Sequence, residues 1–151
     1  IAISDGDVTN CVRIIFLSNE IVGQVRAGGS EQFFITASGI SIEQYNKIAV
    51  HYKLNQCKLF VNGSQIGATD TSASMPTGLN TLEFAEGNGT DNFYGEVKAV
   101  AVYKTALTDT ELANLTSYNN HDLFIPYRSR MQMISADQEL QCTEHDITRF
   151  L

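Results

Sequence analysis

The chain has 151 residues, the length of one domain whose folding buries roughly two thirds of the surface that the unfolded chain exposes. Hydrophobic residues make up 43% of it and charged residues 18%, a composition that excludes a disordered chain. The net charge of −7 excludes a nucleic-acid-binding function, which needs clustered Lys and Arg, and the apolar runs are too short to span a bilayer.

The first part of the chain is predicted to form β-strands joined by tight turns. Residues 11–17 and 20–26 are rich in branched side chains and flank Ser18-Asn19, so they form a hairpin, and residues 32–36 form a third strand. This spacing of short strands is typical of an all-β domain.

The clearest hairpin joins residues 47–53 to residues 57–61. The first strand alternates between an apolar face and a second face that carries His51. Asn62-Gly63 marks the next tight turn, since both residues tolerate positive φ, and residues 65–68 form a short strand beyond it. Such a meander is typical of antiparallel sheets packed face to face.

Two further strands are predicted at residues 81–85 and 93–103, on either side of a glycine-rich loop at residues 86–92. The second strand is the longest candidate in the chain, and both of its faces carry apolar residues. We therefore expect this strand in the centre of a sheet.

One helix follows these strands. Thr108-Asp109-Thr110-Glu111 is a capping box, in which the Thr108 hydroxyl accepts a hydrogen bond from the Glu111 amide, and the helix ends near Ser117. The composition changes from Tyr118 onward, and we assign no fold there. The sequence thus predicts a domain at residues 1–117 and a C-terminal extension at residues 118–151, which packs on this domain or on a partner chain.

Two stretches of the chain combine strand, turn and helix residues in a fixed order. The first is the hairpin from Ile48-Ala49-Val50-His51-Tyr52 to Leu59-Phe60-Val61-Asn62-Gly63, and the second runs from Phe93-Tyr94-Gly95-Glu96-Val97 through Val102-Tyr103 to Glu111-Leu112. They resemble the signatures of laminin-G-like and pentraxin-like domains over about residues 10–117. The resemblance implies an antiparallel jelly-roll β-sandwich of the concanavalin-like type. The amino-acid sequence of the second stretch is similar to that of domains appended to bacteriophage tail fibres and other virion appendages.

The chain departs from this family in two ways. It contains no tryptophan, and Tyr45-Asn46 stand where the family often has one before the hairpin. The N-terminal strand segment of the family also has no counterpart, and the chain starts at Ile1 like a piece of a longer polypeptide. Because an incomplete sandwich exposes sheet edges, we expect strands from a preceding segment or a neighbouring subunit to complete the domain.

The acidic and histidine residues form no catalytic pattern. Enzymes of this fold that cut β-glucans carry an E-x-D-x-x-E run on one strand, and the chain has none. Glu83 and Glu86 come nearest and are interpreted as solvated rim charges. His51 lies inside a strand, where a packed or hydrogen-bonded role is favoured over that of a base. The sequence therefore predicts that the protein is not an enzyme.

The three cysteines match neither a zinc site nor a disulfide framework, because their number is odd and no C-x-x-C pair occurs. We interpret Cys11, Cys57 and Cys142 as small hydrophobic residues, with a Cys11–Cys57 disulfide as the alternative.

The glycine-rich loop is the candidate ligand site. Sugar binding in such folds combines Asp and Asn side chains with loop amides and one aromatic platform, and a plain hairpin loop is the alternative. The residues that offer this combination are Asn88, Asp91, Asn92 and Tyr94. The candidate metal is Ca²⁺, because it prefers carboxylate and carbonyl oxygens. Asp5 and Asp7 are its candidate ligands, with ordinary turn chemistry as the alternative.

Two functions fit these features. The first is a non-enzymatic carbohydrate-binding or adhesion module of a phage or virion surface appendage, whose partner is a surface polysaccharide or glycan. The alternative is a purely structural virion protein, a tail-fibre or decoration module without glycan binding. In both cases we expect a homo-oligomer that contacts other appendage subunits at the virion or extracellular surface. A glycosidase is the least favoured function.

Overall fold

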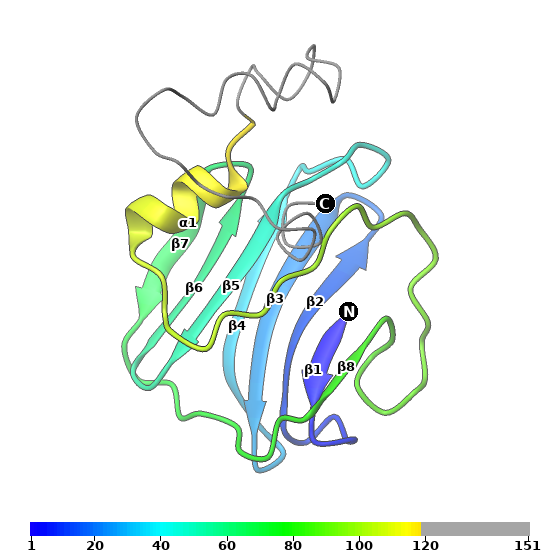
Figure 1. The fold of residues 1–151 in the computed structure, drawn as a ribbon, viewed down its shortest axis with the longest axis vertical. Helices are drawn as coiled ribbons and strands as arrows, with labels where there is room; N and C mark the ends of the chain where they lie inside the picture. The colour runs from blue at the N-terminus through cyan, green and yellow to red at the C-terminus, as the bar shows by residue number, and fades with distance from the viewer. Residues whose placement is uncertain (119–151) are drawn as a thin grey trace, which may run out of the picture. The chain divides into compact units, whose positions relative to one another are not determined.

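The computed structural model describes residues 1–118, which contain eight strands and one α-helix (Figure 1). The elements in chain order are β1 (Ala2–Ser4), β2 (Cys11–Leu17), β3 (Glu20–Ala27), β4 (Ser30–Ser38), β5 (Ile48–Lys53), β6 (Gln56–Val61), β7 (Ser64–Asp70), β8 (Thr81–Glu83) and α1 (Asp109–Thr116). Residues 1–94 and 103–117 form one compact unit, which contains all of these elements. The C-terminal extension predicted at residues 118–151 lies outside the described residues except for Tyr118.

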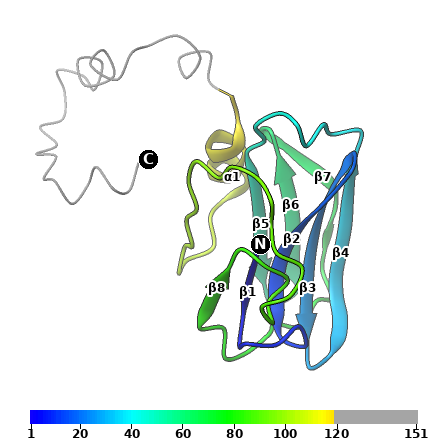
Figure 2. The ribbon, with the colours of Figure 1, turned by 90° about the vertical axis from the view of Figure 1, so that its right-hand side faces the viewer.

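The strands form two antiparallel sheets that lie against each other (Figure 2). The order is β4-β3-β2-β1-β8 in the five-stranded sheet and β5-β6-β7 in the three-stranded sheet. Every neighbouring pair is antiparallel. The predicted all-β sandwich is confirmed.

The turns follow the local sequence signals. Ser18-Asn19 joins β2 to β3 with Leu17 opposite Glu20, as the sequence predicts. At the turn between β6 and β7, Asn62 has φ 51° and Gly63 has φ 88°. Two successive residues with positive φ produce the backbone twist that a tight two-residue hairpin requires, and the turn sets Val61 opposite Ser64.

The core lies between the inner faces of the two sheets. The buried residues of this cluster are Val12, Ile21, Val25, Phe33 and Ala37 from the five-stranded sheet and Cys57, Leu59 and Val61 from β6, with Ala73 from the loop after β7. Fully burying one aliphatic or aromatic side chain contributes roughly 1.5–3 kcal/mol. The alternation of these residues along their strands therefore fixes which face of each sheet turns inward.

Cys11 and Cys57 are both buried and free. Cys57 belongs to the core, whereas Cys11 lies on the opposite face of β2 from the core residue Val12. The interpretation of these residues as small hydrophobic side chains is confirmed, and the alternative of a Cys11–Cys57 disulfide is wrong. Cys142 lies outside the described residues.

One strand prediction is wrong and one strand was missed. Residues 93–103, predicted as a central strand, contain no strand or helix, and residues 95–102 belong to a second unit. The alternating sequence of these residues suits one face of a sheet, but it does not provide a neighbouring strand. A strand forms only where its backbone pairs with another strand. The converse case is β1, whose three residues gave no sequence signal but pair with both β2 and β8.

The helix α1 packs on the outer face of the three-stranded sheet, where it contacts β5, β6 and β7. Its capping box is present as predicted, with Thr108 accepting from the Glu111 amide and Glu111 accepting from the Thr108 amide. Leu112 and Thr116 of the helix are buried. Within residues 1–118, no helix has the length and apolar character needed to cross a membrane.

Candidate functional site

The predicted ligand loop follows β8, the edge strand of the five-stranded sheet (Figure 1), and its Gly87 contacts Ser4 of β1. Two backbone hydrogen bonds close it: the Glu86 amide donates to the Thr90 carbonyl at 2.9 Å, and the Phe93 amide donates to the Phe84 carbonyl at 2.8 Å. The Phe93 ring also lies 5.1 Å from the ring of Phe16 on β2. These contacts give the loop a defined conformation before any ligand is considered.

Gly87 brings the loop into close contact with β1. Its φ is 114°, and an added Cβ would lie 3.4 Å from the Cβ atoms of both Ala2 and Ser4. The fully buried Ser4 hydroxyl donates to the Gly87 carbonyl at 2.8 Å. A side chain at position 87 would be strained by this positive φ, so glycine is favoured where the loop contacts β1.

An ion pair makes the second attachment. Arg13 on β2 is buried, and its guanidinium pairs with the carboxylate of Glu86. The Arg13 Nε donates to the Gln24 side chain, whose Nε2 donates in turn to Glu31 at 2.8 Å. Arg13 stands opposite Gln24 on the outer face of the sheet, so the network crosses from β2 to β4. The buried side chains of Arg13 and Gln24 thus have hydrogen-bond partners, as buried polar groups generally do.

The charge of Glu86 depends on these partners. Burial by itself raises the pKa of the Glu86 carboxyl, but the hydrogen bond from Arg13 and the positive charges of Arg13 and Arg26 outweigh it, so the pKa lies below its usual value. The carboxylate therefore stays ionised and paired at neutral pH. The interpretation of Glu86 as a solvated rim charge is wrong, because this residue links the loop to a buried arginine. Glu83 accepts a hydrogen bond from the Gly89 amide and so also helps to hold the loop.

The structure brings all four predicted ligand residues into this one loop. Asn88 and Asp91 have defined roles there: the Asn88 side-chain oxygen accepts from the amide and the hydroxyl of Thr90, and Asp91, with φ 50°, interacts with the Glu86 carboxyl. Asn92 is exposed, and the Tyr94 side chain is 91% exposed. The loop therefore presents one carboxylate, one amide and one aromatic ring on a backbone held by the sheet.

The two predicted calcium ligands lie in the turn between β1 and β2. The Asp5 carboxylate accepts from the amide of Asp7 and from the side chain of Asn10, and the Asp7 carboxylate accepts from the amide of Thr9. Among residues 1–118, no group of three or more His, Cys, Asp and Glu side chains is placed to hold a metal ion. The hydrogen bonds account for both carboxylates as turn residues, and calcium binding here stays a prediction.

Sequence reasoning missed the residues that hold the loop in place. In the sequence, Arg13 occupies a position that an alternating strand turns to solvent, and neither Ser4 nor Gln24 belongs to a recognisable motif. The one signal available was a basic residue within the apolar run of residues 11–17, which needs a carboxylate if it is buried.

Comparisons with known proteins place the fold in a family. The model of the laminin-G type 3 family, described as the concanavalin A-like lectin/glucanases superfamily, matches residues 6–113. The chain belongs to the concanavalin A-like lectin/glucanase superfamily. This match spans strands β2 to β8, the glycine-rich loop and the start of α1, so the resemblance of the two signature stretches to laminin-G-like domains is confirmed.

A search of the solved structures found an S-layer domain-containing protein (residues 221–444) from Clostridium thermocellum, with 18% identity and a TM-score of 0.43. The match covers 76% of this chain and 60% of that one, so the chain spans less than two thirds of that structure. No match was found among the curated proteins. The name of the superfamily includes both lectins and glucanases, so the activity of this member depends on its own site residues.

Proposed function

We propose that the protein is a non-enzymatic carbohydrate-binding or adhesion module of a phage or virion appendage, which binds a surface polysaccharide or glycan through the loop of residues 86–94. The observation that carries the proposal is the fixed loop with its exposed side chains. Glu86 and Gly87 attach the loop to the buried residues Arg13 and Ser4, while Asp91, Asn92 and Tyr94 are exposed.

The chemistry of this loop suits a sugar. A carboxylate accepts hydrogen bonds from sugar hydroxyl groups, an amide both donates and accepts them, and the apolar face of a sugar ring packs on an aromatic ring. Because the loop is held by the sheet, a ligand would not have to order it on binding, which lowers the entropic cost of association.

Binding to an array of purified polysaccharides and glycans tests the proposal. Asp91→Ala and Tyr94→Ala should each weaken saturable binding by at least about tenfold if the residue contacts the ligand, which corresponds to about 1.4 kcal/mol. Glu43→Ala and Leu54→Ala remove an exposed charge and an exposed apolar side chain elsewhere on the domain, so they serve as matched controls. An array without saturable binding, or equal losses in the control variants, would reject the proposal.

A structural role in the virion is the second candidate, and one observation favours it. Among the described residues 1–118, the five-stranded sheet faces three strands, and on β8 and just after it Leu82 and Phe84 are 45% and 46% exposed. Apolar side chains at a sheet edge are typical of subunit contacts. If the appendage uses the domain only for assembly, the wild-type protein gives a flat array and yet forms a homo-oligomer in light scattering that Leu82→Ser disrupts.

Catalysis is the remaining alternative. No E-x-D-x-x-E run occurs in the sequence, and the carboxylate of Glu86 is engaged with Arg13 rather than directed at a substrate. A glycosidase needs one carboxyl group with a raised pKa to act as an acid, whereas the pKa of Glu86 is lowered. Release of reducing sugar from a bound polysaccharide would overturn the non-enzymatic assignment.

A further inference from the structure

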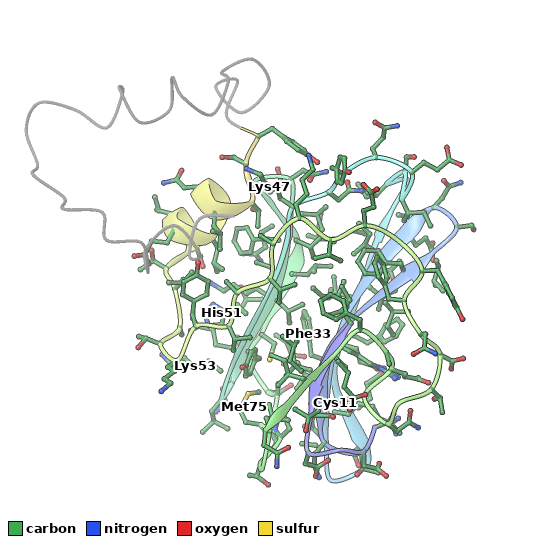
Figure 3. All side chains as sticks on the ribbon, turned by 45° about the vertical axis from the view of Figure 1, so that its right-hand side comes forward. Cys11, Phe33, Lys47, His51, Lys53 and Met75 are labelled. Atoms are coloured by element: carbon green, nitrogen blue, oxygen red, sulfur yellow. The ribbon has the colours of Figure 1, made fainter. Side chains whose placement is uncertain are left out.

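His51 lies in the layer between the three-stranded sheet and α1. It stands on β5 opposite Lys58 of β6, on the face turned away from the core residue Leu59. Figure 3 shows His51 on the other side of β5 from Phe33, which belongs to the core. Only 7% of the residue is exposed, so the side chain is packed, which is the role that the sequence pattern favoured over that of a base.

Within the part of the chain that the structure describes, the imidazole of His51 has no hydrogen-bond partner on either ring nitrogen. A buried polar atom without a partner is rare in a folded protein, because it has lost its contact with water and gained nothing in return. Protonation would make the situation worse, since the charged ring would then carry two buried donors without acceptors.

Two of the three charged groups around the ring oppose its protonation, Lys58 on β6 and Lys53 on β5 itself, whereas Asp109 at the first turn of α1 favours it. The single carboxylate among them already pairs with Lys58, which is 5% exposed. Burial is the largest cause that lowers the pKa of His51, and the charge of Lys58 is the second. The charge of Asp109 offsets them only in part.

The same ion pair fixes α1 to the sheet. Lys58 and Asp109 hold the start of the helix, while the Gly63 amide donates to Thr116 at 3.1 Å and Lys47 donates to the Ser117 carbonyl at 2.9 Å at its end. A positive charge on His51 must compete with Lys58 for Asp109 or move into water. Both routes loosen the first turn of α1.

We propose that His51 makes the docking of α1 sensitive to pH: the helix stays on the sheet while the imidazole is neutral and loosens when it is protonated. The direction follows from linkage. The folded protein binds the proton less readily than the undocked state, so the stability of docking is complete above the ordinary pKa of about 6.5 and is lost as pH falls towards the lowered value. If His51 stays neutral while docked, the undocked population rises by up to about 30-fold between about pH 8 and pH 5.

Amide hydrogen exchange measures this change. The Leu112 amide, which donates to the Thr108 carbonyl, reports on the first turn of α1, and its protection factor corrects for the intrinsic pH dependence of exchange. We expect the protection to fall by about 10-fold to 30-fold across this window in the wild type, and to stay constant in His51→Phe and His51→Gln, which cannot titrate. The window lies above the usual titration of Asp and Glu side chains.

His121 and His145 allow a matched control, since they are the two other histidines of the chain. The double variant His121→Gln/His145→Gln should keep the pH dependence of the wild type. Constant protection in the wild type, or equal pH dependence in both His51 variants, would overturn the proposal. If neither His51 variant folds, the ring resonances of wild-type His51 decide: they should titrate below about pH 6.5, and titration at or above that value would reject the proposal.

Discussion

The ion pair between Arg13 and Glu86 is expected to determine how firmly the loop of residues 86–94 is held. In Glu86→Ala, the guanidinium of Arg13 stays buried without its carboxylate and keeps only the side chain of Gln24. Breaking a fully buried pair costs about 3–5 kcal/mol. The Glu86 side chain is 33% exposed, so water reaches part of the guanidinium, and we expect a loss of about 2 kcal/mol in the free energy of unfolding.

Urea unfolding followed by circular dichroism measures this loss, and thermal unfolding should show a decrease in Tm of roughly 4–8 °C. Glu83→Ala is the matched control, because it removes a carboxylate of the same loop that accepts one amide hydrogen bond; it should cost about 0.5–1 kcal/mol. A double-mutant cycle with Arg13→Met separates the coupling of the pair from the loss of each side chain. Equal effects of the two glutamate variants, or a coupling free energy near zero, would refute the argument that Glu86 attaches the loop through Arg13.

Three further predictions concern pH, the helix and the cysteines. Because the folded-state pKa of Glu86 is lowered, its contribution is complete above about pH 4.5 and is lost as pH falls below it, so acid unfolding of Glu86→Gln should show a shallower pH dependence than the wild type. Thr108→Ala removes the N-cap acceptor and should cost about 1 kcal/mol in urea unfolding, while Thr108→Ser stays within a few tenths of the wild type. Burial raises the pKa of the Cys57 thiol to about 11, so at about pH 8 mass spectrometry after alkylation should find at most one adduct per native chain, at Cys142, and three in denaturant; native labelling of Cys57 or Cys11 would contradict their burial.

Local signals in the sequence were sufficient for the hairpins and the helix. The Asn62-Gly63 turn needs two residues that accept positive φ, and both residues adopt it. The capping box at Thr108 and Glu111 is satisfied by atoms three residues apart. Alternation along residues 48–53 placed Val50 and Tyr52 against the core. Each of these features depends on neighbours in the chain, so the sequence by itself determined them.

The tertiary structure decided the features that depend on distant partners. Residues 93–103 have the side-chain pattern of a strand, yet none forms there. The three residues of β1 became a strand because β2 and β8 pair with them on both sides. The backbone hydrogen bonds of a sheet join segments far apart in the sequence, so a pattern within one segment predicts a face and not a pairing.

The same distinction holds for the candidate site. The sequence predicted the loop and its exposed residues Asp91 and Tyr94, because Gly, Asn and Asp mark a turn wherever they cluster. It did not show that Glu86 reaches back to Arg13, 73 residues earlier in the chain, or that His51 is buried with no hydrogen-bond partner among residues 1–118. Burial and charge pairing arise only when distant segments pack together. This packing made Arg13 of β2 the attachment point of the loop, and it made His51 of β5 a proposed pH-sensitive contact.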